Sequence, residues 1–404
     1  MKRNVVGIRR AAILGALIAG AAIFTSCATA GKRVTVLTYN THLFGGSNAE
    51  HAHKLEHVGE PIGDIGSAIK EKKVEPIFDE AKTAEIVFDD ENRAESIAKK
   101  LETCGADIVA LQELWSCDRP RWFAERLTKV YPHKFYYTEQ CPEVTFVKFA
   151  WEVTREGTSQ EAVKNQIKKK NYKLMNGLLL LSKYPIETAK FHEFPAGRTG
   201  DKKDQLARKG VITATIALPN GLRLRVGVTH ATTDVGGWQS MPDIANLAEY
   251  STEGADKIGP AIMMGDFNAH YYTANAAEYN RMSDIFARVG ALDAYRQAKK
   301  RNDMTVNWAA NPLLRYFFPE KQEPACIDYV FYRPSGPGLT IKPESAKVVT
   351  DWKYRVTNLY SRAIMKGKTR DVDLSDHYPV VATFSLWNGP NPITWVDPEP
   401  PRAR

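Results

Sequence analysis

Short apolar runs recur along the chain, and each has about the length of a buried β-strand. They cover residues 34–40, 107–112, 178–183, 211–218, 222–229, 261–265, 327–333 and 379–386. Residues 219–221, Pro-Asn-Gly, predict a hairpin turn between two of these runs. Between others, apolar residues return every three or four positions, which is the period of an amphipathic helix. The pattern therefore predicts strands and helices interspersed along one chain.

Three helices can be located in this way. The first is expected at residues 93–101, with Asp90 as its cap and Gly105 beyond its end. The second opens at residues 240–242, where Pro242 stands near the start, and the third covers residues 282–289. The apolar face of the first helix consists of Ala94, Ile97, Ala98 and Leu101.

Acidic, amide and imidazole side chains stand at the ends of the strand-like runs or within them. Asp266 and Asn268 follow an apolar run and lie two positions apart, so they point to the same side of a strand. The other such residues are Asn40, Glu113, His230, Asp328, Asp376 and His377. Singly, each has an ordinary structural explanation, such as a turn or a cap. Together they indicate one site, because carboxylates and amides can hold a hard cation beside a phosphate oxygen.

The order of these motifs resembles that of the endonuclease/exonuclease/phosphatase superfamily, which includes pancreatic-type deoxyribonucleases, inositol polyphosphate phosphatases and neutral sphingomyelinases. The matching motifs are Thr38-Tyr39-Asn40, Leu111-Gln112-Glu113, Thr229-His230, Gly265-Asp266-Phe267-Asn268, Ile327-Asp328-Tyr329 and Ser375-Asp376-His377. The resemblance implies a deoxyribonuclease-like α/β fold, a four-layer α/β/β/α sandwich with two mainly antiparallel sheets and the site at one end. Because it covers nearly the whole chain, we expect a single catalytic domain over residues 31–388.

The resemblance also implies a metal site. Glu113 is the expected principal ligand of Mg²⁺, with Mn²⁺ or Co²⁺ as alternatives, because a hard divalent ion binds few protein carboxylates and several waters. Asn40 and Asp376 would complete this cluster. Asp266 and Asn268 would hold the attacking water or a second metal ion, and Asn268 would also contact a phosphate oxygen.

Proton transfer is expected from the histidines. His377 is the candidate general base, since imidazole titrates near neutral pH, and the resemblance implies that Asp328 fixes its other ring nitrogen. His230 would contact the phosphoryl group or protonate the leaving oxygen. The expected reaction is in-line attack on a phosphodiester by a metal-assisted water, without a covalent enzyme intermediate.

One segment discriminates between substrates. Residues 204–211 resemble a segment of neutral and bacterial sphingomyelinases in which an Asp and a Lys, here Asp204 and Lys209, stand five residues apart before a strand. The resemblance implies that Lys209 lies near the phosphate and that Asp204 governs its position; an ordinary surface charge pair would also explain the two residues.

We therefore expect a phosphodiesterase that converts sphingomyelin to ceramide and phosphocholine at a membrane surface. The inositol phosphatase signature is matched only in part, because no Arg directly follows Asp328. The alternatives are a secreted Mg²⁺-dependent nuclease, for which nucleic acid would be the partner, and an inactive lipid-anchored binding protein on the same fold. We expect a monomer without an obligate protein partner.

Residues 1–26 have the layout of an export signal, a basic start followed by an apolar run over residues 11–24 that is too short to span a bilayer comfortably. The basic residues are Lys2, Arg3, Arg9 and Arg10. Residues 24–27 resemble a bacterial lipobox, which would leave a membrane-anchored lipoprotein modified at Cys27. Residues 28–30, Ala-Thr-Ala, are the alternative cleavage site and would release a soluble periplasmic or extracellular protein beginning at Gly31.

Charge and cysteine content add two expectations. Loss of residues 1–26 lowers the formal net charge of +8 by four, to +4, which is mild for a dedicated nucleic-acid binder. Export favours disulfides, and without Cys27 the remaining cysteines allow three pairings, of which 117 with 141 closes the shortest loop. These cysteines are Cys104, Cys117, Cys141 and Cys326.

Three segments are expected outside the core. Residues 45–88 contain three histidines but no acid or cysteine ligand at matching spacing, so a solvated insert is expected there. Residues 154–173 include three consecutive lysines and predict either a solvated helix or a contact with anionic lipid. The Pro-rich residues 389–404 are expected to form a loose tail without strand or helix.

Overall fold

The computed structural model describes residues 32–43, 90–116, 118–137, 175–195, 207–233, 239–272, 274–317, 321–356 and 371–393. The expected export signal, Cys27, the two inserts, Asp204 and residues 394–404 lie outside these ranges. Among the helices that the described ranges contain, none is long and apolar enough to cross a membrane.

Within the described ranges, eight strands form the larger sheet, in the order β11-β12-β15-β1-β2-β4-β3, with β16 paired to β15. Their bounds are β1 Arg33–Leu43, β2 Ile108–Leu114, β3 His133–Phe135, β4 Leu179–Ser182, β11 Ser335–Gly336, β12 Leu339–Val348, β15 Val380–Asn388 and β16 Asn391–Pro392. The β1–β2 pair is parallel, and the other pairs of this sheet are antiparallel. The carboxyl ends of β1 and β2 therefore lie at the same edge.

Six strands form the second sheet, in the order β5-β6-β7-β8-β10-β9. Their bounds are β5 Ile186–Glu193, β6 Gly210–Ala217, β7 Arg223–His230, β8 Ala261–Tyr271, β9 Leu292–Asp293 and β10 Cys326–Arg333. Here β7 and β8 are the parallel pair. Two short strands, β13 Lys353–Arg355 and β14 Asp371–Asp373, pair with each other outside both sheets.

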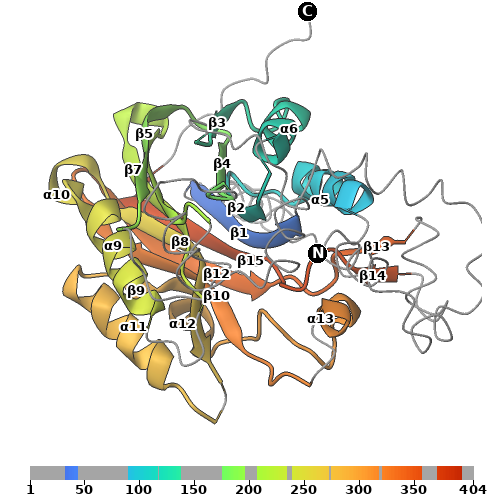
Figure 1. Cartoon of the computed structure of the whole chain (residues 1–404). Coiled ribbons are helices and arrows are strands. Elements are labelled where there is room, and N and C mark those ends of the chain that lie inside the picture. Colours follow the sequence, from blue (N-terminus) through green and yellow to red (C-terminus); the bar gives the residue numbers. More distant parts are fainter. Residues whose placement is uncertain are drawn as a thin grey trace, which may run out of the picture.

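The two sheets pack face to face, and helices cover the outer face of each (Figure 1). Alternation along each strand explains this: in β1, Val34 and Val36 enter the core between the sheets, while Leu37 and Tyr39 pack under α5 and α6. On the second sheet, α9 and α11 cover β8 and β10. The helices are α5 Asp90–Thr103, α6 Asp118–Arg126, α9 Ser240–Thr252, α10 Ala255–Ile258, α11 Ala277–Arg288, α12 Ala294–Lys299 and α13 Pro312–Phe317.

The predicted four-layer α/β/β/α fold is confirmed, and so are the three helices. Each of the eight predicted runs lies inside a strand or extends at most one residue beyond either end of it, namely β1, β2, β4, β6, β7, β8, β10 and β15. The hairpin between β6 and β7 is also present: Pro219–Gly221 forms a single 3₁₀ turn, with Asn220 at φ 62°. The spacing of apolar residues was therefore sufficient to locate the central strands of both sheets.

Three details differ from the prediction. β8 does not end at residue 265 but continues to Tyr271, so Asp266 and Asn268 lie inside a paired strand. The tail does not leave the domain at once: Gly389, at φ 59°, lets Asn391–Pro392 fold back on β15 as an edge strand, where proline is tolerated. Cys104 and Cys326 are free cysteines, whereas Cys117 and Cys141 lie outside the described residues.

Candidate active site

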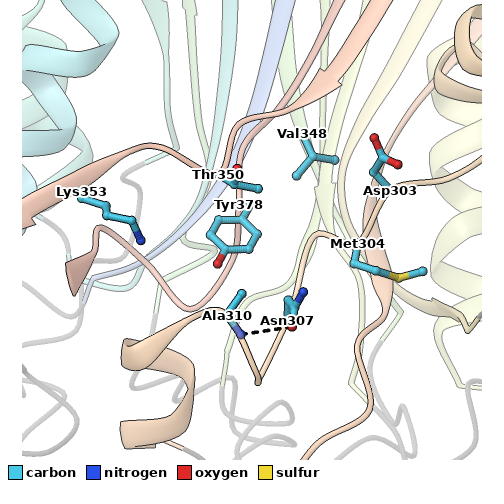
Figure 2. A pocket seen from close by; sticks show the side chains of 8 residues that line it. All are labelled: Asp303, Met304, Asn307, Ala310, Val348, Thr350, Lys353 and Tyr378. Carbon is cyan, nitrogen blue, oxygen red and sulfur yellow. Dashed lines mark hydrogen bonds between the residues drawn. The ribbon is translucent and has the colours of Figure 1, made fainter. Parts of the chain in front are cut away.

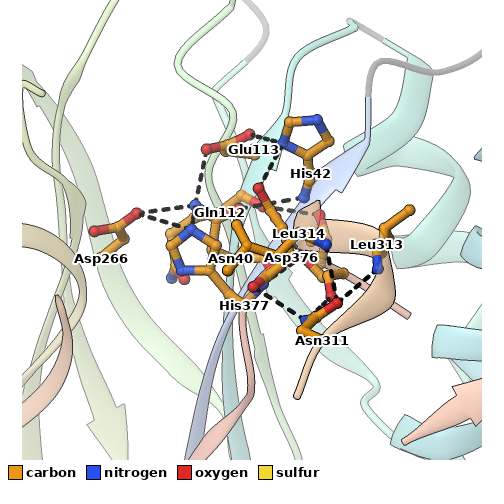
Figure 3. A network of polar contacts seen from close by, with 12 residues as sticks. Asn40, His42, Gln112, Glu113, Asp266, Asn311, Leu313, Leu314, Asp376 and His377 are labelled. Atoms are coloured by element: carbon orange, nitrogen blue, oxygen red, sulfur yellow. Dashed lines mark hydrogen bonds and ion pairs between the residues drawn. The ribbon is translucent and has the colours of Figure 1, made fainter. Parts of the chain in front are cut away.

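The carboxyl ends of the two parallel strand pairs converge at one end of the sandwich (Figure 3). At their meeting point the Asn40 amide nitrogen donates to Glu113 Oε1 at 2.8 Å and to Asp266 Oδ2 at 2.9 Å. The Asn40 amide oxygen accepts the His42 backbone N–H at 3.2 Å. In this arrangement Asn40 links two carboxylates from opposite sheets, and its role as a metal ligand stays a prediction.

His42 is a member of this cluster that the sequence pattern did not reveal. Its Nδ1 lies 3.2 Å from Glu113 Oε2 and 3.5 Å from Asp376 Oδ2, so one imidazole bridges two of the predicted metal ligands. Ser375 fixes Asp376 in turn, because its hydroxyl bonds the carboxylate at 3.0 Å and the Asn40 carbonyl at 2.8 Å. The ends of β1 and β2 and the loop before β15 therefore share one network.

His377 and Asp328 form the predicted pair. The His377 Nδ1 lies 2.9 Å from Asp328 Oδ2, and its Nε2 faces the cluster, 3.9 Å from Asp266 Oδ2 and 3.5 Å from the Asn40 amide nitrogen. Asp328 lies opposite Asp266 in the β10–β8 register. One ring nitrogen is thus fixed by a carboxylate and the other is directed toward the other carboxylates, which is the geometry that a general base requires.

His230 and Lys209 lie together on the other side of Glu113. The His230 Nε2 is 3.6 Å from Asp266 Oδ2 and 3.9 Å from Glu113 Oε1, and the Lys209 ammonium is 3.3 Å from that same nitrogen. Lys209 is 1% exposed and also donates to the Ala231 carbonyl at 2.9 Å. Lys209 is therefore part of the cluster, which excludes the explanation as an ordinary surface charge.

Trp115 and Asn268 complete this side of the site. The Trp115 indole N–H donates to Glu113 Oε2 at 3.2 Å, and its ring lies 5.5 Å from the His230 ring. The Asn268 amide nitrogen donates to the Ala231 carbonyl at 3.0 Å, so Lys209 and Asn268 share one acceptor. Trp115 was not predicted; it stands two positions after Glu113 in sequence.

Backbone strain is concentrated at these strand ends. His42, Glu113 and Asn268 have φ values of 47°, 59° and 48°, a left-handed conformation that non-glycine residues adopt only when the surroundings stabilise it. At Gly265 a Cβ would lie 1.9 Å from the Thr229 carbonyl oxygen, so no larger residue fits between β8 and β7 there. The strand ends are therefore bent to present their side chains, at a cost in conformational energy.

Burial and neighbouring charge shift the ionisation of these groups in different directions. Burial, followed by the nearby Asp328 carboxylate, raises the pKa of Asp266 to about 7. Burial alone would raise the pKa of Glu113, but the hydrogen bond and charge of His42 and the charges of His230 and His377 lower it well below its usual range. Burial would lower the pKa of His377, but Asp328, Asp376 and Asp266 raise it well above its usual value. The carboxylates and histidines of the cluster therefore interact strongly with one another. A bound cation would oppose the raised pKa of His377, which must be deprotonated to act as a base.

The donor set fits a hard divalent cation. Glu113, His230 and Asp266 form one group whose ligand atoms lie within 4.8 Å of one another, and Asp266, Asp328 and His377 form a second. Among the described residues, Asp328 Oδ1 is buried without a hydrogen-bond partner, which is costly unless a cation or polar ligand lies nearby. Carboxylate oxygens at several corners of one buried space are the ligands that Mg²⁺ prefers.

Asn311 holds the loop that carries Asp376 and His377. Its amide nitrogen donates to the Ser375 and Asp376 carbonyls at 2.9 and 3.2 Å. Its amide oxygen accepts the N–H groups of Leu313 and Leu314 in the first turn of α13 (Figure 3). The loop is thereby attached to a helix start, with Asn311 fully buried between them.

A pocket of about 510 Å³ lies beside the same loop, where Tyr378 rather than His377 faces it (Figure 2). Its lining residues are Asp303, Met304, Asn307, Ala310, Val348, Thr350, Lys353 and Tyr378. The charges there are paired, Lys353 with Asp373 at 2.7 Å and Asp303 with Arg301 at 3.0 Å. None of the predicted site residues that the structure describes is among its lining residues.

A four-layer sandwich with carboxylates and histidines converging at one end of its paired sheets defines the deoxyribonuclease-like class of phosphoesterase folds. The chain belongs to the endonuclease/exonuclease/phosphatase family, whose sequence model matches residues 88–377. That match spans the predicted residues from Glu113 to His377.

Solved structures share this fold at low sequence identity. A double mutant of beta toxin from Staphylococcus aureus with bound magnesium ions is 16% identical, with a TM-score of 0.53, and the match covers 87% of this chain and 99% of that chain. TDP2 from D. rerio, complexed with a single-strand DNA product, is 14% identical, with a TM-score of 0.50, and the match covers 87% of this chain and 99% of that chain. Sphingomyelinase C from Streptomyces griseocarneus is 20% identical, with a TM-score of 0.48, and the match covers 87% of this chain and 99% of that chain. At these identities the likeness shows the fold alone. No curated protein matches the chain in sequence.

Proposed function

We propose that this protein is a metal-dependent phosphodiesterase that hydrolyses the headgroup ester of a phospholipid, with sphingomyelin as substrate and ceramide and phosphocholine as products. The observation that carries the proposal is the placement of the buried Lys209 ammonium 3.3 Å from His230, at the edge of a cluster of carboxylates. The sequence motif that pointed to a phospholipid substrate thus contributes a side chain to the site itself.

The side chains supply the functions that phosphodiester hydrolysis requires. His377, held through Nδ1 by Asp328, accepts the proton of the attacking water at Nε2. Lys209 and His230 face the side where a phosphoryl oxygen or the leaving oxygen is stabilised. Glu113, with Asp376 or Asp266, would hold Mg²⁺, which would supply positive charge against the phosphoryl oxygens. Because Lys209, His230, Asp328 and His377 are buried, their electrostatic effect is weakly screened.

The preference for a phospholipid over nucleic acid rests on Lys209, since the fold is shared by proteins with different ligands and does not choose between them. The mild charge of the chain also supports it, because nucleic-acid binders usually present a denser basic surface. A nuclease and an inactive binding protein are the alternatives that an assay must separate.

The test is a substrate panel. The purified protein is incubated with Mg²⁺ and, separately, with sphingomyelin vesicles, phosphatidylcholine vesicles, plasmid DNA and an inositol phosphate; its His377→Ala variant provides the blank. We expect phosphocholine release from sphingomyelin to exceed every other reaction. Rapid DNA cleavage without lipid turnover would show a nuclease, and no turnover of any substrate would show a binding protein.

Lys209→Ala is expected to lower kcat/KM for the phospholipid by roughly 10²–10³-fold, the loss seen when one buried electrostatic donor to a transition state is removed. Asp204→Ala should also lower kcat/KM. The kcat/KM of the double variant should be no lower than that of the more impaired single variant, because the two residues act as a unit. Steady-state kinetics on sphingomyelin measure all three.

Lys183→Ala is the matched control, since Lys183 is bonded to Asp107 at 3.1 Å outside the cluster. It should leave kcat/KM within about two-fold of wild type, as surface substitutions usually do. If Lys209→Ala behaves like this control, the ammonium does not act on the phosphate, and the substrate assignment loses its support.

A further inference from the structure

Arg93 is a fully buried arginine whose guanidinium bonds backbone carbonyls on both sides of the site. It belongs to the first turn of α5, and its guanidinium reaches into the larger sheet. One terminal nitrogen donates to the Thr41 carbonyl at 3.3 Å and to the Leu374 carbonyl at 3.1 Å. The other donates to the His42 carbonyl and, at 2.6 Å, to Asp90 Oδ1.

The three carbonyls belong to two of the segments that present predicted metal-binding groups. Thr41 and His42 directly follow Asn40, and Leu374 stands just before the loop of Asp376. These segments lie far apart in sequence, and the guanidinium is a rigid planar fork that can satisfy several acceptors at once. One buried cation thus fixes the end of β1 relative to the loop before β15.

The same contacts explain the strained backbone at His42. With φ at 47°, the residue directs its carbonyl toward Arg93 and its ring toward Glu113 and Asp376. A buried carbonyl without a donor would cost about 1–3 kcal/mol, so the arginine removes a penalty that would otherwise oppose this conformation.

Helix packing does not account for the guanidinium. Ala94, Ile97, Ala98 and Leu101 form the apolar face of α5 that packs on the sheet, and an aliphatic residue at 93 would extend that face. Arg119 provides a contrast, since it is also buried but its guanidinium bonds the side chain of Glu91 on α5 instead of backbone near the site.

We propose that Arg93 is a positioning residue for the metal site: by holding the carbonyls of Thr41, His42 and Leu374 together, it sets the position of His42, which faces Glu113, relative to Asp376. Loss of this contact is expected to weaken metal binding as outer-shell substitutions do, by roughly 10–100-fold. The kinetic part of this inference rests on the proposed function, whereas the metal-binding part does not.

The experiment uses the full chain and compares Arg93→Lys and Arg93→Met with Arg119→Lys and Arg119→Met. Terbium(III) is the probe, because Trp115 is bonded to Glu113 and can sensitise its luminescence. Mg²⁺ is titrated against bound terbium without substrate, and the Mg²⁺ dependence of kcat and KM is measured in parallel. Thermal unfolding of each variant reports the stability lost through burial alone.

We expect both Arg93 variants to raise the half-saturating Mg²⁺ concentration by roughly ten-fold or more. They should lower kcat by a larger factor than the factor by which KM changes. The Arg119 variants should lose comparable thermal stability and keep half-saturation within about two-fold. If Arg93→Met does not fold, Arg93→Lys and Asp90→Asn, which keeps the guanidinium but removes its partner charge, decide the question.

Folded Arg93 variants that bind Mg²⁺ like wild type would overturn the proposal and leave Arg93 a purely structural residue. The failure of the proposed function is a different outcome: a chain inert toward every phosphodiester, but with weakened terbium and Mg²⁺ binding in the Arg93 variants only, would support the positioning role and reject the enzyme.

Discussion

Replacing His377 by alanine is expected to lower turnover of the preferred phosphodiester by roughly 10²–10⁴-fold, the range for loss of a general acid–base group. The imidazole accepts a proton in the chemical step, so substrate binding should change little. KM should therefore stay near its wild-type value while kcat falls. The melting temperature should fall, because the buried Asp328 carboxylate loses its partner. Steady-state kinetics and a melting curve of the purified variant test this directly.

Asp328→Asn serves as the graded comparison. The substitution keeps the shape of the side chain that lies 2.9 Å from His377 Nδ1 but removes its charge. Turnover should therefore fall, but by less than in His377→Ala. A His377→Ala variant that retained more than about a tenth of the wild-type rate would assign the base to another group, since a general base contributes roughly 10²–10⁴-fold.

Glu113→Gln is expected to lower both metal affinity and rate by roughly two orders of magnitude or more, as removal of a charged metal ligand does. The amide preserves the shape of the side chain but loses the charge that faces His42, His230 and the cation. Activation curves for Mg²⁺, followed by activity in excess chelator, measure the two effects separately.

Glu91→Gln is the matched control, because that carboxylate pairs with Arg119 and lies away from the cluster. It should need no more Mg²⁺ than wild type. Full activity of the wild-type protein in excess chelator would refute the metal requirement altogether, whatever the behaviour of Glu113→Gln.

The sequence predicted the central strands and the site residues at their ends because both are local features. A run of apolar residues followed by Asn40, Glu113 or His230 carries the information within a few positions. β5 and β12 were missed for a local reason too: β5 is a half-exposed edge strand, and β12 carries Pro343 at a register shift.

Two of the residues that sequence reasoning missed, His42 and Arg93, depend on contacts from distant parts of the chain. His42 gave one usable signal, since it follows Asn40 by two positions, as Asn268 follows Asp266. Arg93 gave none: it reads as a charged residue at a helix start, and its burial depends on carbonyls 51 and 281 positions away. Such roles appear only when both segments are placed in space.

The position of β15 has a consequence for the synthesis of the protein. This last long strand lies between β12 and β1 in the interior of the larger sheet, and Asp376 and His377 directly precede it. The contact of Asn40 with His377 spans 337 positions. A ribosome-bound chain that has not yet released residues 380–388 therefore lacks both the strand and the geometry of the site. The site can therefore form only after this segment has left the ribosome and paired with β1, however early the rest of the larger sheet begins to fold.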